Sequence, residues 1–179
     1  MAAVEPHLAS SVCAGLYAPG SGTGHPWEMG IAAAENAAAN GVEFHLNTGV
    51  TGITQTEDGF AVSAGHDTYT CRALVNCAGL YADTINDMVA APTFRIRPSK
   101  GDYGVLDAGA GGIVNHIVLH KPAITGTGAT LLPPAHGNLL LGPSNEDAPS
   151  KTHFSTPPDG LALVGATARA VFPAVPSEP

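Results

Sequence analysis

Charged residues are few in this sequence, and positive charge is especially scarce. Seven of the 179 residues are Lys or Arg and 15 are Asp or Glu, which gives a formal net charge of −8. Nucleic-acid binding needs clustered cations that displace counterions, so the composition excludes that class. The charged fraction of 12% is well below a typical value of about 25%. Either part of the surface is covered by protein outside this chain, or the composition is simply rich in Gly, Ala and Pro.

Cysteine and long apolar runs are scarce as well. Cys13, Cys71 and Cys77 form no C-x-x-C pair, a pattern that favours a reducing cytoplasm over a disulfide scaffold. No apolar run approaches the roughly 20 residues of a membrane helix. The start "MAAVEPHLASS" lacks the basic and apolar stretches of a secretion signal, so we expect a cytoplasmic location.

The first clear element is a helix predicted over residues 25–41, "HPWEMGIAAAENAAANG". Pro26 suits the first helical position, Glu28 lies in the first turn, and Asn40-Gly41 is a stop signal. One apolar stripe of this helix is expected to pack closely on a sheet. The stripe consists of Trp27, Ile31, Ala34 and Ala38.

Alternating apolar residues separated by turn signals predict strands after this helix. The predicted strands cover residues 42–47, 50–56, 60–65, 68–72 and 73–77. Most of them form an antiparallel meander of short strands. The last, "ALVNC", is a continuous apolar run typical of a strand that is buried on both faces.

The second half of the chain predicts another antiparallel sheet with Gly- and Pro-rich loops, followed by a helix over residues 157–173. Its predicted strands cover residues 94–99, 102–107, 112–120, 129–133 and 138–143. The fold class expected is therefore α+β, with one part over residues 1–91 and a second over residues 92–179.

Several catalytic patterns are absent. The eight histidines are scattered, and although His116 and His120 are four residues apart, no Cys or Glu stands at a zinc-like spacing. We therefore predict no metal site. There is no G-x-S-x-G elbow. The glycines of "PGSGTG" (19–24) follow no strand and precede no Lys-Ser/Thr pair, so they form neither a nucleotide phosphate loop nor a dinucleotide fingerprint.

The stretch "LVNCAGLYAD" (74–83) ends a predicted strand in the small residues Cys77, Ala78 and Gly79. By itself this pattern fits a tight turn as well as a backbone that a ligand approaches closely.

Six stretches in one order give this motif a context. They are "EPHL" (5–8), "LYAPGSGTGHPWEMGIAAAENAAANGVEFHLNTGVTGI" (16–53), "LVNCAGLYAD" (74–83), "IRPSKGDYGVLD" (96–107), "GIVNHIV" (112–118) and "GNLLLGPSNED" (137–147). In this order they resemble FAD-dependent oxidoreductases of the D-amino-acid oxidase type. The branch that they resemble most contains bacterial glycerol-3-phosphate dehydrogenases and L-2-hydroxyglutarate oxidases.

The resemblance implies roles for particular residues in FAD binding. It places Cys77, Ala78 and Gly79 beneath the ADP part of FAD, which they would approach by backbone, because bulky side chains would hold the cofactor off. It places the backbone of Val50 against the adenine. The first part of the chain would then be a partial FAD-binding domain made of a helix, a meander and a strand.

The second part would be an antiparallel-sheet substrate domain lying over the flavin ring. Lys100 is the cation that the resemblance places nearest a small anionic substrate, such as glycerol 3-phosphate or a 2-hydroxy acid, and Tyr103 is a hydroxyl donor near the same anion. The implied reaction is hydride transfer from a CH–OH carbon to the flavin, with a base removing the hydroxyl proton. His116 is one candidate base, and a residue of a further C-terminal segment is the alternative.

Two positions depart from the family pattern, since Ser99 and Thr127 replace residues that are usually basic. The N-terminal dinucleotide fingerprint and a C-terminal segment that closes over the flavin are also absent. We therefore expect a central fragment that is inactive alone, with the remaining parts of the same protein as its partners. The alternatives are a self-standing module that binds small anions or a protein, and a subunit completed by another chain.

Overall fold

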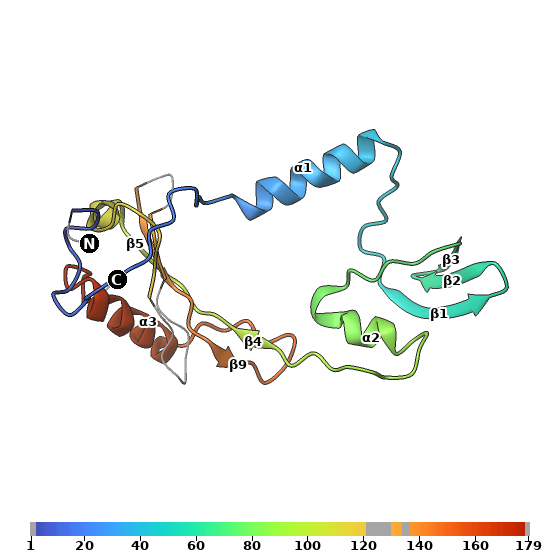
Figure 1. Cartoon of the computed structure of the whole chain (residues 1–179). Coiled ribbons are helices and arrows are strands. Elements are labelled where there is room, and N and C mark those ends of the chain that lie inside the picture. Colours follow the sequence, from blue (N-terminus) through green and yellow to red (C-terminus); the bar gives the residue numbers. More distant parts are fainter. Residues whose placement is uncertain (1–2, 121–129, 134–136, 178–179) are drawn as a thin grey trace. The chain divides into compact units, whose positions relative to one another are not determined.

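The computed structural model describes residues 3–120, 130–133 and 137–177 (Figure 1). The chain divides into two compact units, one formed by Gly24–Pro98 and the other by Met1–Thr23 together with Ser99–Pro179. These limits differ from the predicted parts, residues 1–91 and 92–179. The N-terminal segment belongs with the second unit because the amide of Ala9 donates to the carbonyl of Val171, at 2.8 Å.

The unit Gly24–Pro98 contains a three-stranded antiparallel meander in the order β1-β2-β3, as the sequence predicts. Gly59 starts β2 with φ +152°, and a Cβ there would overlap the backbone of Cys71 in the next strand. Glycine is therefore required at this tight turn. The elements of the unit are α1 (Pro26–Ala39), β1 (Val50–Thr56), β2 (Gly59–Ala64), β3 (Asp67–Cys71), the 3₁₀ helix η1 (Gly79–Tyr81) and α2 (Ala82–Asn86).

Helix α1 has the predicted ends but not the predicted packing. Pro26 occupies its first turn, and Gly41 follows its end with φ +88°. No residue of α1 is buried, and Trp27 and Ile31 are 73% and 58% exposed. The predicted contact of the helix stripe with a sheet is thus wrong within the described chain.

Two predicted strands, residues 42–47 and 73–77, are also wrong. Both segments are irregular, and Val75 is 81% exposed. A strand needs a neighbour for its N–H and C=O groups. The sheet formed by the described residues of this unit contains only β1, β2 and β3, so neither segment has such a neighbour here.

The second unit contains a four-stranded antiparallel sheet in the order β5-β8-β7-β6 and a separate pair β4-β9. Both units combine helices with antiparallel strands, which confirms the α+β class. The elements are β4 (Ser99–Lys100), β5 (Gly104–Leu106), η2 (Ala108–Ile113), β6 (Val118–Leu119), β7 (Thr130–Leu132), β8 (Leu139–Gly142), β9 (Glu146–Asp147) and α3 (Pro158–Val171).

Most strands of this unit are shorter than predicted. In residues 94–99 only Ser99 is in a strand, and the start of the predicted strand 112–120 is the 3₁₀ helix η2. The side chain of Asp107 begins η2 by accepting from the amide of Ala108, at 2.6 Å. This local cap favours a helical turn over an extended strand. Residue 129 of the predicted strand 129–133 lies outside the described residues.

The core of the second unit lies between α3 and the four-stranded sheet. Buried α3 residues recur every three or four positions, which places them on one helix face. Phe172, directly after α3, is fully buried. The core residues are Leu106, Ala110, Val114, Leu131, Leu139, Leu141, Val164, Ala168, Val171, Phe172 and Val175.

We predict that Phe172→Ala lowers the free energy of unfolding by about 3–5 kcal/mol, because it leaves a cavity beneath α3. The matched control is Phe154→Ala, since Phe154 is 81% exposed. The control is expected to change stability by less than about 0.5 kcal/mol. Urea denaturation of the full chain measures both, and equal losses would contradict the placement of the core.

Candidate functional site

The tripeptide predicted to approach FAD lies at the surface of the unit Gly24–Pro98. Cys77 and Gly79 are exposed and Ala78 is half-buried. Gly79 has φ +55°, and a Cβ built on it would meet no atom within 4 Å. Glycine is therefore required here by the left-handed backbone and not by a crowding neighbour, and the surface above it is open to a ligand.

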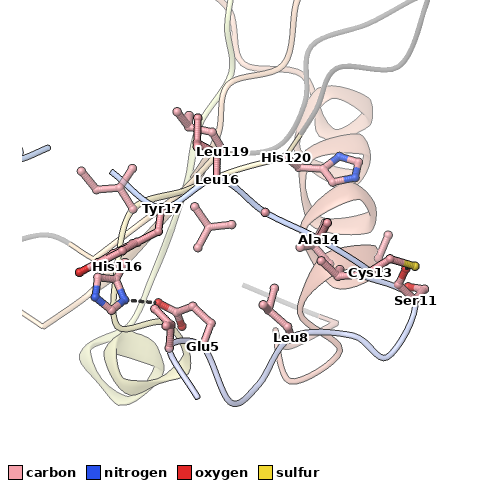
Figure 2. Close-up of a pocket in the computed structure, with 17 residues that line it drawn as sticks. Glu5, Leu8, Ser11, Cys13, Ala14, Leu16, Tyr17, His116, Leu119 and His120 are labelled. Atoms are coloured by element: carbon pink, nitrogen blue, oxygen red, sulfur yellow. Dashed lines mark hydrogen bonds and ion pairs between the residues drawn. The ribbon is translucent and has the colours of Figure 1, made fainter. Parts of the chain in front are cut away.

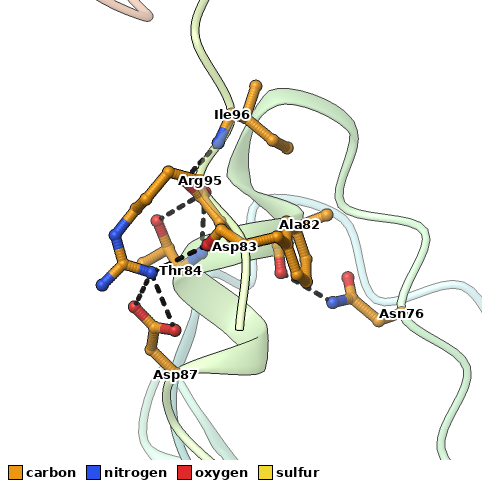
Figure 3. A network of polar contacts seen from close by, with 8 residues as sticks. Asn76, Ala82, Asp83, Thr84, Asp87, Arg95 and Ile96 are labelled. Atoms are coloured by element: carbon orange, nitrogen blue, oxygen red, sulfur yellow. Dashed lines mark hydrogen bonds and ion pairs between the residues drawn. The ribbon is translucent and has the colours of Figure 1, made fainter. Parts of the chain in front are cut away.

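Asn76 holds this tripeptide in its bend by two hydrogen bonds, of which Figure 3 shows the one to Ala82. Its side-chain oxygen accepts from the amide of Ala78 at 3.2 Å, and its side-chain NH₂ donates to the carbonyl of Ala82 at 2.8 Å. One side chain thus links the bend to the first residue of α2. The sequence analysis missed Asn76, although Asn before small residues is a turn signal.

A second set of contacts in Figure 3 ties α2 to the segment that leaves the unit. The buried carboxylate of Asp83 accepts from the amides of Thr84 at 2.8 Å and Ile96 at 3.1 Å. Arg95 forms an ion pair with Asp87 at 2.8 Å.

Val50, the predicted adenine contact, begins β1 in the same unit and is 36% exposed. The cofactor roles of Val50 and the tripeptide stay predictions.

Lys100 lies in a cluster of acceptors in the second unit. Its Nζ contacts Asp102 Oδ2 at 2.8 Å, the Ser155 carbonyl at 3.2 Å and Glu146 Oε2 at 3.5 Å. The hydrogen bond to Asp102, together with the charges of Asp102 and Glu146, raises the pKa of Lys100 against the opposing effect of desolvation. A substrate anion would have to compete with these acceptors, so the predicted anion contact of Lys100 stays a prediction.

Gly160 brings α3 against the same cluster, because a Cβ at this position would overlap Asp102 Oδ2. Asp102 is only 5% exposed, and its amide donates to Ser144 Oγ at 2.9 Å. The cluster therefore joins β4, β9 and the start of α3, which gives Lys100 a structural function independent of any ligand.

Tyr103 is half-exposed and lines a groove of about 540 Å³ beside α3. Leu141, Val164 and Arg169 also line this groove, and Arg169 donates to the Pro176 carbonyl at 3.0 Å. The lining includes Tyr103 but not Lys100, so the two predicted substrate residues do not share this groove.

His116 lies beside a buried carboxylate that the sequence analysis missed (Figure 2). His116 Nδ1 is 2.7 Å from Glu5 Oε1, and the Glu5 side chain is 5% exposed. The amide of Asn115 donates to both Glu5 oxygens, at 3.1 Å each. The Tyr17 and His116 rings form a T-shaped pair, with centroids 5.5 Å apart and planes at 86°. The only signal in the sequence was Glu5 within "EPHL", and no local pattern links it to residue 116.

The Glu5–His116 pair lines a pocket of about 540 Å³ between the N-terminal segment and β6. Figure 2 shows His120 directed toward α3, well separated from the His116 ring.

Within the described residues, no three His, Cys, Asp or Glu side chains are grouped as metal ligands, and all three cysteines are free. Thr127 lies outside the described residues. None of the helices in the described part of the chain is both long and apolar enough to cross a membrane.

Comparison with known proteins gives one consistent result. The family described as FAD dependent oxidoreductase (DAO) matches residues 1–179. A glycerol 3-phosphate dehydrogenase of Caloramator mitchellensis is 39% identical over 166 residues, which are 93% of this chain and 35% of that protein. An L-2-hydroxyglutarate dehydrogenase of Escherichia coli is 30% identical over 134 residues, which are 73% of this chain and 32% of that protein.

The fold is similar to that of a solved oxidase structure. The crystal structure of glycine oxidase from Geobacillus kaustophilus superimposes with a TM-score of 0.82 at 21% identity, covering 97% of this chain and 45% of that chain. The chain spans about a third of the length of the two relatives and less than half of the glycine oxidase chain.

The raised pKa of Lys100 predicts a loss of stability at alkaline pH. The folded state holds the Lys100 proton more tightly than the unfolded state, so this stabilisation is complete below the unshifted pKa of 10.5 and is lost as the pH rises through the folded-state pKa. Urea midpoints measured from about pH 8 to about pH 11.5 test this, with two variants. Lys100→Met is expected to be less stable at pH 8 and to approach the wild type at high pH. Lys100→Arg stays charged and should decline less. Parallel curves for wild type and Lys100→Met would contradict the ion pair.

Proposed function

Because this chain belongs to the DAO family of FAD-dependent oxidoreductases, we propose that it is the central part of an enzyme that oxidises the CH–OH group of a small anion. Glycerol 3-phosphate is the first proposed substrate and a 2-hydroxy acid the second. The observation that carries this proposal is the 39% identity, over 93% of the chain, to a protein named glycerol 3-phosphate dehydrogenase.

The backbone at Cys77–Gly79 fits a share of the FAD site. Its side chains are small, Cys77 and Gly79 are exposed, and Asn76 holds it in place. We propose that it contacts the ADP part, with Val50 near the adenine. Bound FAD supplies the hydride acceptor. Residues 1–179 contain no dinucleotide fingerprint for the pyrophosphate, so this chain alone is proposed to hold FAD weakly and to be inactive without the remaining parts of the protein.

Three side chains of the second unit have proposed tasks toward the substrate. Tyr103 donates a hydrogen bond to the substrate anion. Lys100 gives up its longest contact, the ion pair with Glu146 at 3.5 Å, and forms one with the substrate anion instead. It keeps its ion pair with Asp102 at 2.8 Å. His116 accepts the hydroxyl proton at Nε2, since its side chain is 42% exposed. A base from another part of the protein is the alternative.

The second candidate function is a non-enzymatic module that binds a small anion or a protein segment, and the groove beside Tyr103 supports its protein-binding form. Its lining is largely apolar, which suits a ligand with a hydrophobic body. A cytoplasmic location stays a prediction from the cysteine pattern.

A chimaera tests the proposed function. The matching 166-residue segment of the Caloramator mitchellensis protein is replaced by this chain's own segment. The purified chimaera is expected to retain FAD and, under anaerobic conditions, to lose its flavin absorbance when glycerol 3-phosphate is added. The unaltered Caloramator protein is the positive control, and the full chain alone, incubated with FAD and filtered, is expected to retain little flavin.

The outcomes separate the candidates. Flavin reduction by L-2-hydroxyglutarate instead of glycerol 3-phosphate would move the substrate to the 2-hydroxy acids. A folded chimaera that retains no FAD would contradict the proposed function and favour the non-enzymatic module.

In the same chimaera, Gly79→Ala is expected to lower FAD affinity by about tenfold or more. A residue with a Cβ is strained by about 1–2 kcal/mol in the left-handed conformation, and the relaxed backbone no longer fits the cofactor. Gly30→Ala is the matched control, because Gly30 lies in α1 with open space around it. Equal FAD affinities in a fluorescence titration would remove Gly79 from the cofactor site.

A further inference from the structure

The strongest unassigned feature of the chain is the buried Glu5 carboxylate beneath His116. A buried carboxylate costs free energy unless hydrogen-bond donors surround it. The Asn115 amide reaches both oxygens at 3.1 Å, and the His116 ring supplies the closest contact at 2.7 Å. Glu5 therefore acts as an acceptor toward a specific ring nitrogen.

We infer that Glu5 is the positioning residue of His116, an inference that rests on the proposed function for its catalytic meaning. With both oxygens accepting, the shared proton of the pair lies on His116 Nδ1. The opposite nitrogen, Nε2, then carries a lone pair and no proton, which is the form that accepts a proton from a substrate hydroxyl.

The His116 ring contacts Tyr17 on one side and is open to two pockets. The Tyr17 and His116 rings form a T-shaped pair with centroids at 5.5 Å. No hydrogen-bond partner of Nε2 is present among the described residues, and the side chain is 42% exposed. His116 and Tyr17 both line two pockets, of about 540 and 380 Å³, so the imidazole is accessible to a small molecule.

A purely structural task for Glu5 would need only the Asn115 contact. That contact joins the N-terminal segment to the segment before β6, and it would persist with a neutral amide at position 5. The contact with Nδ1 is different, because an amide offers both a donor and an acceptor and no longer selects the tautomer. The substitution Glu5→Gln therefore separates the two tasks.

The test is the tautomer of His116 in the full chain, measured by long-range ¹H–¹⁵N correlation on ¹⁵N-histidine-labelled protein with the ring neutral. In the wild type we expect the proton on Nδ1 and an unprotonated Nε2. In Glu5→Gln the proton is expected to move substantially to Nε2. The signals of His45 and His153, which contact Tyr69 and Ser155 instead, serve as internal controls and should not change.

Two results would overturn the inference: a wild-type His116 with its proton on Nε2, or a tautomer unchanged by Glu5→Gln. If the control signals show that Glu5→Gln does not fold, Glu5→Asp replaces it. This variant keeps the charge but shortens the side chain, and it should produce the same shift to a smaller extent.

Catalysis is tested separately in the chimaera described above. Glu5→Gln is expected to slow flavin reduction by about tenfold or more while FAD remains bound. An unchanged rate would overturn the catalytic part of the inference. If His116→Gln also leaves the rate unchanged, the base assignment of the proposed function is wrong, whereas the tautomer of His116 in the full chain still decides whether Glu5 positions the ring.

Discussion

The packing of α3 against the four-stranded antiparallel sheet is the interaction on which the second unit depends. Leu131, Leu139, Ala168 and Phe172 are fully buried at this contact. The amide of Ala9 donates to the carbonyl of Val171, the last residue of α3, at 2.8 Å. This bond ties the N-terminal segment, which carries Glu5, to the helix that covers the core.

The unit Gly24–Pro98 has no comparable core. Its meander is paired internally, yet large apolar side chains of α1 and of the segments 42–47 and 73–77 are exposed. The low charged fraction of the sequence had two interpretations, and one of them was a surface covered by protein outside this chain. Exposed apolar side chains are what that interpretation predicts. The matched segments make up 35% and 32% of the two relatives.

The candidate residues of the two units depend on two different kinds of contact. At Cys77–Gly79 the contacts are local, because Asn76 lies within six residues of both of its partners. At His116 they are distant, since Glu5 is 111 residues away in sequence. Lys100 combines both kinds, pairing with Asp102 two residues on and with the carbonyl of Ser155 across the fold. The local contacts of Asn76 fix the backbone conformation at Cys77–Gly79. The distant contacts determine which hydrogen-bond partners His116 and Lys100 have.

By itself the sequence determined α1, α3, the meander and the family. Helix-end signals act over a few residues and can be recognised in the sequence, as at Pro26 and Gly41. The same is true of the alternating apolar residues that predict β1, β2 and β3. Only the tertiary structure decided that residues 42–47 and 73–77 remain unpaired, that Lys100 is surrounded by carboxylates, and that Glu5 lies under His116. The physical reason is that pairing, burial and tautomer depend on which distant groups become neighbours, and no local preference encodes that.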